Sequence, residues 1–333
     1  MSGDERARQA LLSEPLAPRQ GPPPQLPLSA AVDPPTVAAA LRRARSLGVD
    51  RLDAQLLLAR ALGRPRTWLL AHDDEVPTAD QAARFDADLA RRADGVPLAY
   101  LLGEKEFRGL LLCVTPDVLV PRPDTETLAD WAVEALAALD ATAGGGAVGA
   151  GTGRREPLRI VDLGTGSGAV ALALAQTCAE AGRAAAVCAV DVSAAALEVA
   201  RDNARRLGLA VEWLRGDWWS ALPGRRFDLA VSNPPYVAEG DPHLAALRHE
   251  PALALASGAD GLDALRTLIG GAGGHLAPGG RLLVEHGHGQ AAAVRALLRD
   301  AGFAGIETRR DLAGNARCSG GRGPAAAGTP ATD

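Results

Sequence analysis

Residues 158–168 read LRIVDLGTGSG, an apolar run followed by a glycine-rich turn. The apolar stretch 169–181 that comes next predicts a helix, and the run before the turn predicts a strand. Glycines at such a junction let the backbone turn tightly and come close to a ligand. The stretch therefore predicts a strand–turn–helix unit with a ligand at the turn. The cofactor-binding candidates in it are Gly164, Thr165, Gly166, Ser167 and Gly168.

The same alternation continues towards the C-terminus. Strands are expected in AVCAVDV, VEWLRGDW, FDLAVSNPPY, GRLLVEHG and FAGIET, with helices over 193–207, 262–272 and 290–301. Strands that alternate with helices predict a doubly wound, Rossmann-like α/β sheet. Ligands of such sheets bind at the carboxyl ends of the strands. The remaining candidate motifs all lie at such ends.

The N-terminal half has a different pattern. Apolar residues recur at helical spacing from Thr36, and a capping-box pattern at Thr78 and Gln81 opens a further helix. Gly109 separates two short β-prone runs, which predicts a hairpin. Residues 141–157 are glycine-rich but lack the Gly-Lys-Ser/Thr of a phosphate loop, so a flexible insert is expected. The predicted organisation is a disordered proline-rich extension, a helical bundle, a hairpin linker, a catalytic domain and a flexible tail, over residues 1–35, 36–97, 98–121, 122–317 and 318–333.

Composition narrows the function classes. The 333 residues carry 35 Lys and Arg against 40 Asp and Glu, which disfavours a general nucleic-acid binder. No apolar run is long enough to span a membrane, and the polar N-terminus does not resemble a secretory signal. The four cysteines form no C-x-x-C pair, so a reduced, cytoplasmic protein without a structural metal is expected. His286 and His288 lack further ligands and are expected to have a loop role.

Two further positions favour a nucleoside. Asp191 ends the strand AVCAVDV, where a carboxylate accepts hydrogen bonds from a ribose diol, although a helix-capping role is the alternative. Asp217 and Trp218 follow the next strand, and a polar acceptor beside an aromatic plane suits an adenine ring. Trp218 and Trp219 fit a hydrophobic core equally well. These motifs do not choose between NAD and S-adenosylmethionine.

Asn233-Pro234-Pro235-Tyr236 closes the strand FDLAVS. Asn233 supplies a side-chain carbonyl, and the rigid Pro-Pro step leaves the Pro234 carbonyl free of internal competition. Two such acceptors bind both hydrogens of a planar NH2 group, and Tyr236 supplies a flat wall. The nitrogen lone pair then faces an electrophile, and positioning lowers the barrier for this weak nucleophile. Hydride transfer needs no such arrangement.

Three alternatives remain open on these residues alone. An amino-group methyltransferase acting on nucleic-acid bases uses the same chemistry, but it predicts a basic groove. A dinucleotide-dependent oxidoreductase fits the glycine turn and Asp191 and leaves the Asn-Pro-Pro-Tyr motif unexplained. A non-catalytic adenosine-binding module predicts damage to that motif, which is intact here.

Longer motifs carry a family resemblance from about residue 36 to residue 317. They are GVPLAYLLGEKEF, VTPDVLVPRPDTETL, DLGTGSGAVALALA, GDWWSAL, FDLAVSNPPYV, EPALALASGADGLDALR and DLAGNAR. In them the chain resembles the peptide chain release factor N5-glutamine methyltransferases. VPRPDTE and the EPALAL–DGL segment are the most specific.

The resemblance implies methyl transfer from S-adenosylmethionine to the glutamine amide of the Gly-Gly-Gln motif in class I release factors. It implies that Gly164–Gly168 hold the methionine end, Asp191 the ribose and Trp218 the adenine. Asn233, Pro234, Pro235 and Tyr236 are then the catalytic and substrate-binding residues, and Asn233 is also counted among the cofactor-binding residues. Arg122, Asp124 and Glu126 are expected to brace the site.

The chain departs from the family at two places. Arg108 stands where an aromatic residue is usual, and Ala316-Arg317-Cys318-Ser319 replaces an acidic residue and a β-rich strand after Asn315. The final strand is therefore expected to be short, irregular or missing.

Overall fold

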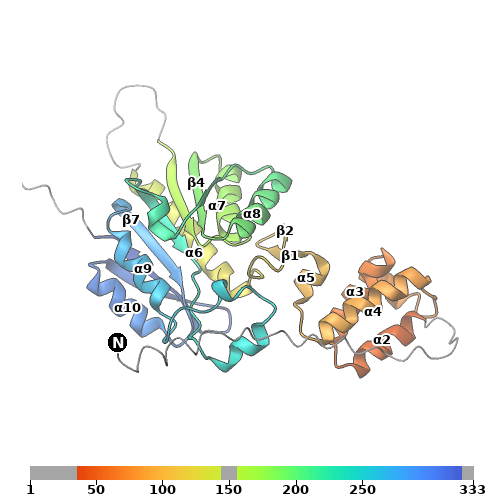
Figure 1. The fold of residues 1–333 in the computed structure, drawn as a ribbon. Helices are drawn as coiled ribbons and strands as arrows, with labels where there is room; N and C mark the ends of the chain where they lie inside the picture. Colours follow the sequence, from red (N-terminus) through yellow and green to blue (C-terminus); the bar gives the residue numbers. More distant parts are fainter. Residues whose placement is uncertain (1–35, 144–155, 325–333) are drawn as a thin grey trace, which may run out of the picture.

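A computed structural model describes residues 36–143 and 156–324. The expected extension 1–35, most of the glycine-rich insert and residues 325–333 lie outside the described residues. In the remainder the chain forms a helical bundle, a short hairpin and a sheet covered by helices (Figure 1).

Two helices of the bundle begin directly after residues whose side chains cap them. The Thr78 and Gln81 capping box is present, and the Asp50 side chain accepts a hydrogen bond from Leu52 N at 2.7 Å. Phe85 and Leu89 are buried in the bundle core. The elements are α2 (Val37–Ser46), α3 (Arg51–Leu62), the 3₁₀ helix η1 (Arg66–Leu70) and α4 (Ala79–Ala93).

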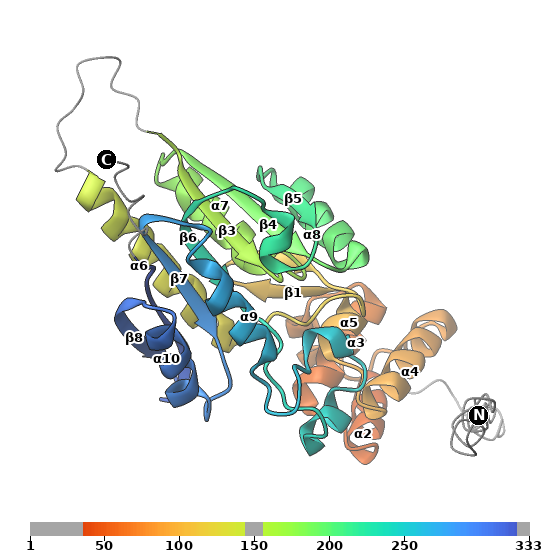
Figure 2. The same ribbon diagram turned by 60° about the vertical axis from the view of Figure 1, so that its left-hand side comes forward.

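The connection to the sheet is the expected hairpin, preceded by one short helix. These elements are α5 (Leu98–Leu102), β1 (Glu104–Phe107) and β2 (Leu110–Cys113). Figure 2 shows them between the bundle and the sheet. Arg108 and Gly109 form the turn with φ angles of 47° and 80°. The Arg108 guanidinium pairs with Asp130 at 2.7 Å, so it joins the turn to helix α6.

The sheet has seven strands in the order β5-β4-β3-β6-β7-β9-β8. Strands β3 to β7 pair in parallel, whereas β9 runs antiparallel to both of its neighbours. The strands are β3 (Leu158–Leu163), β4 (Ala185–Asp191), β5 (Glu212–Arg215), β6 (Phe227–Ser232), β7 (Leu276–Glu285), β8 (Ala304–Arg310) and β9 (Ala316–Arg322). The chain reverses its course across the sheet between β3 and β6, which is where such folds bind ligands.

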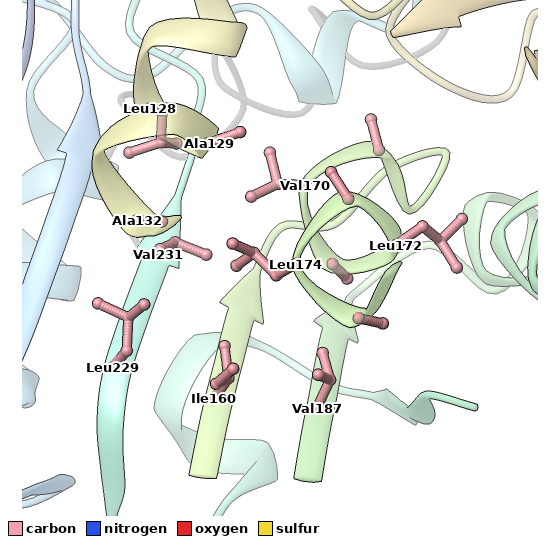
Figure 3. Packing of buried hydrophobic residues seen from close by; sticks show 14 of the residues in the cluster. Leu128, Ala129, Ala132, Ile160, Val170, Leu172, Leu174, Val187, Leu229 and Val231 are labelled. Carbon is pink, nitrogen blue, oxygen red and sulfur yellow. The ribbon is translucent and has the colours of Figure 1, made fainter. Parts of the chain in front are cut away.

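Helices cover both faces of this sheet because its strands are apolar on both sides. Ile160 of β3 packs in one buried cluster with Leu128 and Leu174, and Figure 3 shows these side chains together. Val161 packs in a second cluster with Leu265. The helices are α6 (Pro123–Ala143), α7 (Ala169–Glu180), α8 (Ala194–Leu207), α9 (Asp263–Ala272) and α10 (Ala291–Asp300). Shorter 3₁₀ helices are η2 (Trp218–Ala221), η3 (Pro242–Leu247) and η4 (Ala252–Ala254).

The C-terminal strand is present and seven residues long, and the expected irregularity is confined to its pairing with β8. Residues 316–322 form β9, so the predicted tail from residue 318 begins instead within an interior strand. Hydrogen bonding from both β7 and β8 outweighs the weak β-propensity of this sequence. Gly320 also suits the tight space, because a Cβ there would lie 2.3 Å from the Leu282 carbonyl oxygen.

Candidate active site

A cavity of about 570 Å³ lies at the carboxyl ends of β3, β4 and β6. Small-molecule sites commonly span about 300–1,000 Å³. Its walls also include the segment before α6, the loop around η4 and the start of α9. The predicted residues that line it are Arg122, Gly164, Thr165, Gly166, Ser167, Asp191, Asp217, Trp218, Asn233 and Pro235.

The glycine turn between β3 and α7 forms one wall. Gly164 and Gly166 have φ angles of 74° and 55°, which disfavour a side chain. Asp162 stabilises the turn, because its carboxylate accepts hydrogen bonds from Thr165 Oγ1 at 2.7 Å and from Ala171 N at 3.2 Å. Burial raises the Asp162 pKa to about 6. Gly168 does not line the cavity; it caps α7 and contacts the core around Leu172.

Asp191 lines the cavity, and its carboxylate holds two backbone N–H groups beside it. One carboxylate oxygen accepts from Gly166 N at 2.8 Å and the other from Ser193 N at 2.9 Å. Burial raises the Asp191 pKa, against the effect of these hydrogen bonds. Ser193 itself caps α8. Each Asp191 oxygen keeps a further lone pair, so the carboxylate can still accept from a diol in the cavity.

The two tryptophans have separate places. Trp218 lines the cavity, and a Cβ on Gly164 would lie 3.1 Å from its ring. Trp219 is buried in the core, where its indole N–H donates to the Leu268 carbonyl at 2.9 Å. Glycine at residue 164 therefore makes room for the Trp218 ring beside the turn.

The Asn-Pro-Pro-Tyr motif follows β6 at the same edge. Asn233 Nδ2 donates to Thr125 Oγ1 at 3.0 Å, which leaves the Asn233 carbonyl oxygen available to accept. Pro234 and Tyr236 do not line the cavity. The Tyr236 hydroxyl donates to Glu285 Oε1 at 3.2 Å, and burial raises its pKa.

The charged residues of VPRPDTE each have a partner. Arg122 pairs with Glu250, whose other oxygen accepts from Val120 N at 3.1 Å. Asp124 pairs with Arg317 of β9 at 2.9 Å. These contacts join the segment before α6 to the loop around η4 and to the last strand.

Glu126 completes this set: it accepts from Arg108 N at 3.3 Å, which ties α6 to the hairpin turn.

Two buried residues beside the site, Thr125 and Glu285, were not predicted from the sequence. Thr125 lies within the VPRPDTE motif, but the sequence does not indicate that its side chain is buried in the first turn of α6. Glu285 had a usable signal: it is a carboxylate at the end of an apolar strand, as Asp191 is. His286 occupies the expected loop, yet it is fully buried and its ring contacts Ser319 Oγ at 2.9 Å.

Comparisons with known proteins agree with this geometry. The PrmC N-terminal domain family matches residues 36–103, and the methyltransferase small domain family matches residues 138–250. Among solved structures, the hMettl16 catalytic domain in complex with a 3'UTR hairpin has a TM-score of 0.50 at 15% identity. That alignment covers 71% of this chain and 81% of the other, and it supports the fold.

Curated relatives match most of the chain. The release factor glutamine methyltransferase of Bordetella pertussis is 51% identical over 82% of this chain and 95% of its own length. That of Burkholderia pseudomallei is 48% identical over 87% and 97%, and that of Pseudomonas aeruginosa is 45% identical over 80% and 90%. The chain belongs to the release factor glutamine methyltransferase family.

Proposed function

We propose that this protein transfers the methyl group of S-adenosylmethionine to the glutamine amide nitrogen of the Gly-Gly-Gln motif in release factors. One observation carries the proposal: Asn233 lines the cavity, while its own NH2 group is held by Thr125. Its carbonyl oxygen is therefore free to accept a hydrogen from an amide NH2. The nucleoside-binding residues lie in the same cavity.

The residues present fit S-adenosylmethionine. The backbone at Gly164 to Ser167 lines the cavity, and glycine at residues 164 and 166 lets the methionine end come close to it. Asp191 suits the ribose diol, and Trp218 offers a flat face for the adenine. When bound, this donor supplies an electrophilic methyl group.

The amide substrate is held by acceptors. Asn233, which lines the cavity, accepts one N–H hydrogen of the amide through Oδ1 and orients the nitrogen towards the methyl carbon. The Pro234 carbonyl is the second acceptor that the sequence predicts, although Pro234 does not line the cavity in this structure. The N–C bond forms as the S–C bond breaks, which leaves S-adenosylhomocysteine, and the nitrogen then loses one proton to solvent water. The Pro-Pro step keeps the second acceptor rigid.

Recognition of the whole release factor is assigned to the helical bundle, residues 36–97. A glutamine amide alone gives little specificity, so contacts away from the reacting atoms must select the protein. Arg248 pairs with Asp94 of the bundle at 2.9 Å. The loop Pro251–Ala254 begins three residues after Arg248 and contributes to the wall of the cavity. Leu253 in this loop is 66% exposed.

The test is incubation of the protein with labelled S-adenosylmethionine and an intact release factor. We expect label on the release factor and none when its Gly-Gly-Gln glutamine is changed to alanine. Asn233→Ala should keep donor binding and lower turnover on the order of 100-fold, because it removes an acceptor for the amide. Label on added DNA or RNA instead would support the base methyltransferase and contradict the proposal. A cytoplasmic location, where release factors act, is part of the proposal.

A further inference from the structure

Asn203 is a buried amide on α8 that contacts two other segments of the chain. It is 1% exposed and does not line the cavity. Its Oδ1 accepts from Cys113 N at 2.7 Å, and its Nδ2 donates to the carbonyl oxygens of Cys113 and Ser167, both at 3.0 Å. The opposite orientation of the amide would place its oxygen against two carbonyl oxygens, so these partners decide which atom lies where. The side chain therefore joins β2, α8 and the glycine turn between β3 and α7.

The contact at Ser167 holds a peptide unit in the wall of the cavity. Ser167 is buried and lines the cavity, and Asn203 supplies the donor for its carbonyl oxygen. A buried carbonyl that loses its donor costs free energy. The other end of the same peptide unit is also held, because Gly168 N donates to Thr165 O at 2.9 Å. The orientation of this peptide unit sets where the backbone of Ser167 meets a ligand.

Close packing of α8 against the turn brings Asn203 within reach. A Cβ on Gly168 would lie 3.2 Å from the Ala200 Cβ, so glycine and alanine leave little space between the two segments. Ala200 and Asn203 are three residues apart on a helix, and they therefore share the face that meets the turn. The short Asn203 side chain can then reach the backbone directly.

We propose that Asn203 is a positioning residue for the methyl donor. By holding the Ser167 carbonyl, it fixes the part of the turn that receives the methionine end of S-adenosylmethionine. Asp162 and Asp191 hold the earlier part of the turn. Because Asn203 also pairs with both backbone groups of Cys113, as a neighbouring strand would, it fixes the hairpin to the same turn. The inference rests on the proposed function, since it needs this donor in the cavity.

The experiment compares two ligands of the full-length chain by isothermal titration calorimetry. One is S-adenosylmethionine; the other is 5′-methylthioadenosine, which keeps the adenine, the ribose and the sulfur but lacks the methionine end. Asn203→Leu fills a similar space and forms no hydrogen bonds. We expect the Kd for S-adenosylmethionine to rise by about 5- to 50-fold, and that for 5′-methylthioadenosine by less than about 2-fold. A loss confined to one ligand identifies a positioning role, because general destabilisation affects both.

Two control variants bracket this result. Asp191→Ala should raise the Kd of both ligands, because both contain the ribose. Ser319→Ala removes a buried hydroxyl that contacts His286 at 2.9 Å and Thr308 at 2.8 Å, away from the turn. It should lower the Tm and leave both Kd values unchanged, which separates lost stability from lost positioning.

A second variant makes the test independent of how well leucine is tolerated. Asn203→Asp keeps the acceptor for Cys113 N but loses both donors, so the same selective loss of S-adenosylmethionine binding is expected. The Tm of each variant shows that it is folded. An unchanged Kd for S-adenosylmethionine, or an equal rise for both ligands in a folded variant, would overturn the inference. Failure of the wild-type protein to bind S-adenosylmethionine or to methylate a release factor would instead contradict the proposed function.

Discussion

The Asp191 carboxylate accepts from Gly166 N in the glycine turn and from Ser193 N just before α8, and it also lines the cavity. Asp191→Ala should weaken binding of S-adenosylmethionine by ~1–3 kcal/mol, about 5- to 150-fold in Kd, because hydrogen bonds to an ionised group are lost. Isothermal titration calorimetry measures this, with Asn233→Ala as the control that should bind normally. Tight binding of NAD without binding of S-adenosylmethionine would contradict the assignment.

The Glu285 carboxyl should make folding stability depend on pH. Its pKa rises from 4.5 to about 7 on folding, so the folded state binds the proton more tightly. The resulting stabilisation is complete below pH 4.5 and is lost as the pH rises through about 7, a difference of about 3 kcal/mol.

Urea unfolding at several pH values tests this, with Glu285→Gln as the variant that cannot titrate. Its stability should decline less between pH 5 and 8 than that of the wild type. A similar smaller decline, due to Asp162, should remain in both. Parallel curves would show that Glu285 does not titrate in this range.

For single residues, the sequence predicted several that line the cavity but not the side-chain contacts that position them. Gly164, Asp191, Trp218 and Asn233 each lie at the end of a parallel strand or within three residues after it, and that rule alone brings them to one cavity. Thr125 could not be predicted in the same way, because it is 108 residues from Asn233 and its contact depends on how α6 packs. Pro234 and Tyr236 were predicted to face the substrate directly, yet neither lines the cavity.

At the scale of elements, local signals predicted the helices and the parallel strands, whereas β9 depended on its neighbours. The capping box of Thr78 is a local sequence pattern that predicts where α4 begins. Residues 316–322 carry no such signal, since two glycines and a serine have low β-propensity. Their strand forms because it lies between β7 and β8 and pairs with an edge of each. This arrangement exists only once the sheet has folded.

Gly320 should be intolerant of a side chain. Gly320→Ala puts a Cβ within 2.3 Å of the Leu282 carbonyl oxygen and 2.7 Å of Leu283 Cδ2, so strands β7 and β9 must separate. We expect a loss of about 1–3 kcal/mol in the free energy of unfolding. The control is Gly270→Ala in α9, where nothing lies within 4 Å and alanine should stabilise the helix by about 0.5–1 kcal/mol. Equal effects of the two changes would argue against close packing at β9.

For the whole molecule, the bundle and the sheet have separate cores joined by α5 and the hairpin (Figure 2). A chain that starts at Thr36 should methylate a release factor at the full-length rate. A chain that starts at Pro97 should still bind S-adenosylmethionine but lose most activity on the intact protein, because the recognition surface is gone. Rates are measured with labelled donor, and binding serves as the check of folding. Equal activity of the two chains would show that the bundle does not select the substrate.

The place of Trp218 has an optical consequence. Four of the five tryptophans, Trp68, Trp131, Trp213 and Trp219, do not line the cavity, whereas Trp218 does. An adenine ring that stacks on an indole changes its fluorescence. The protein therefore carries an intrinsic reporter of ligand entry: emission should change on addition of S-adenosylmethionine, and Trp218→Phe should abolish most of that change in a fluorescence titration. A persistent signal in the variant would place the adenine elsewhere.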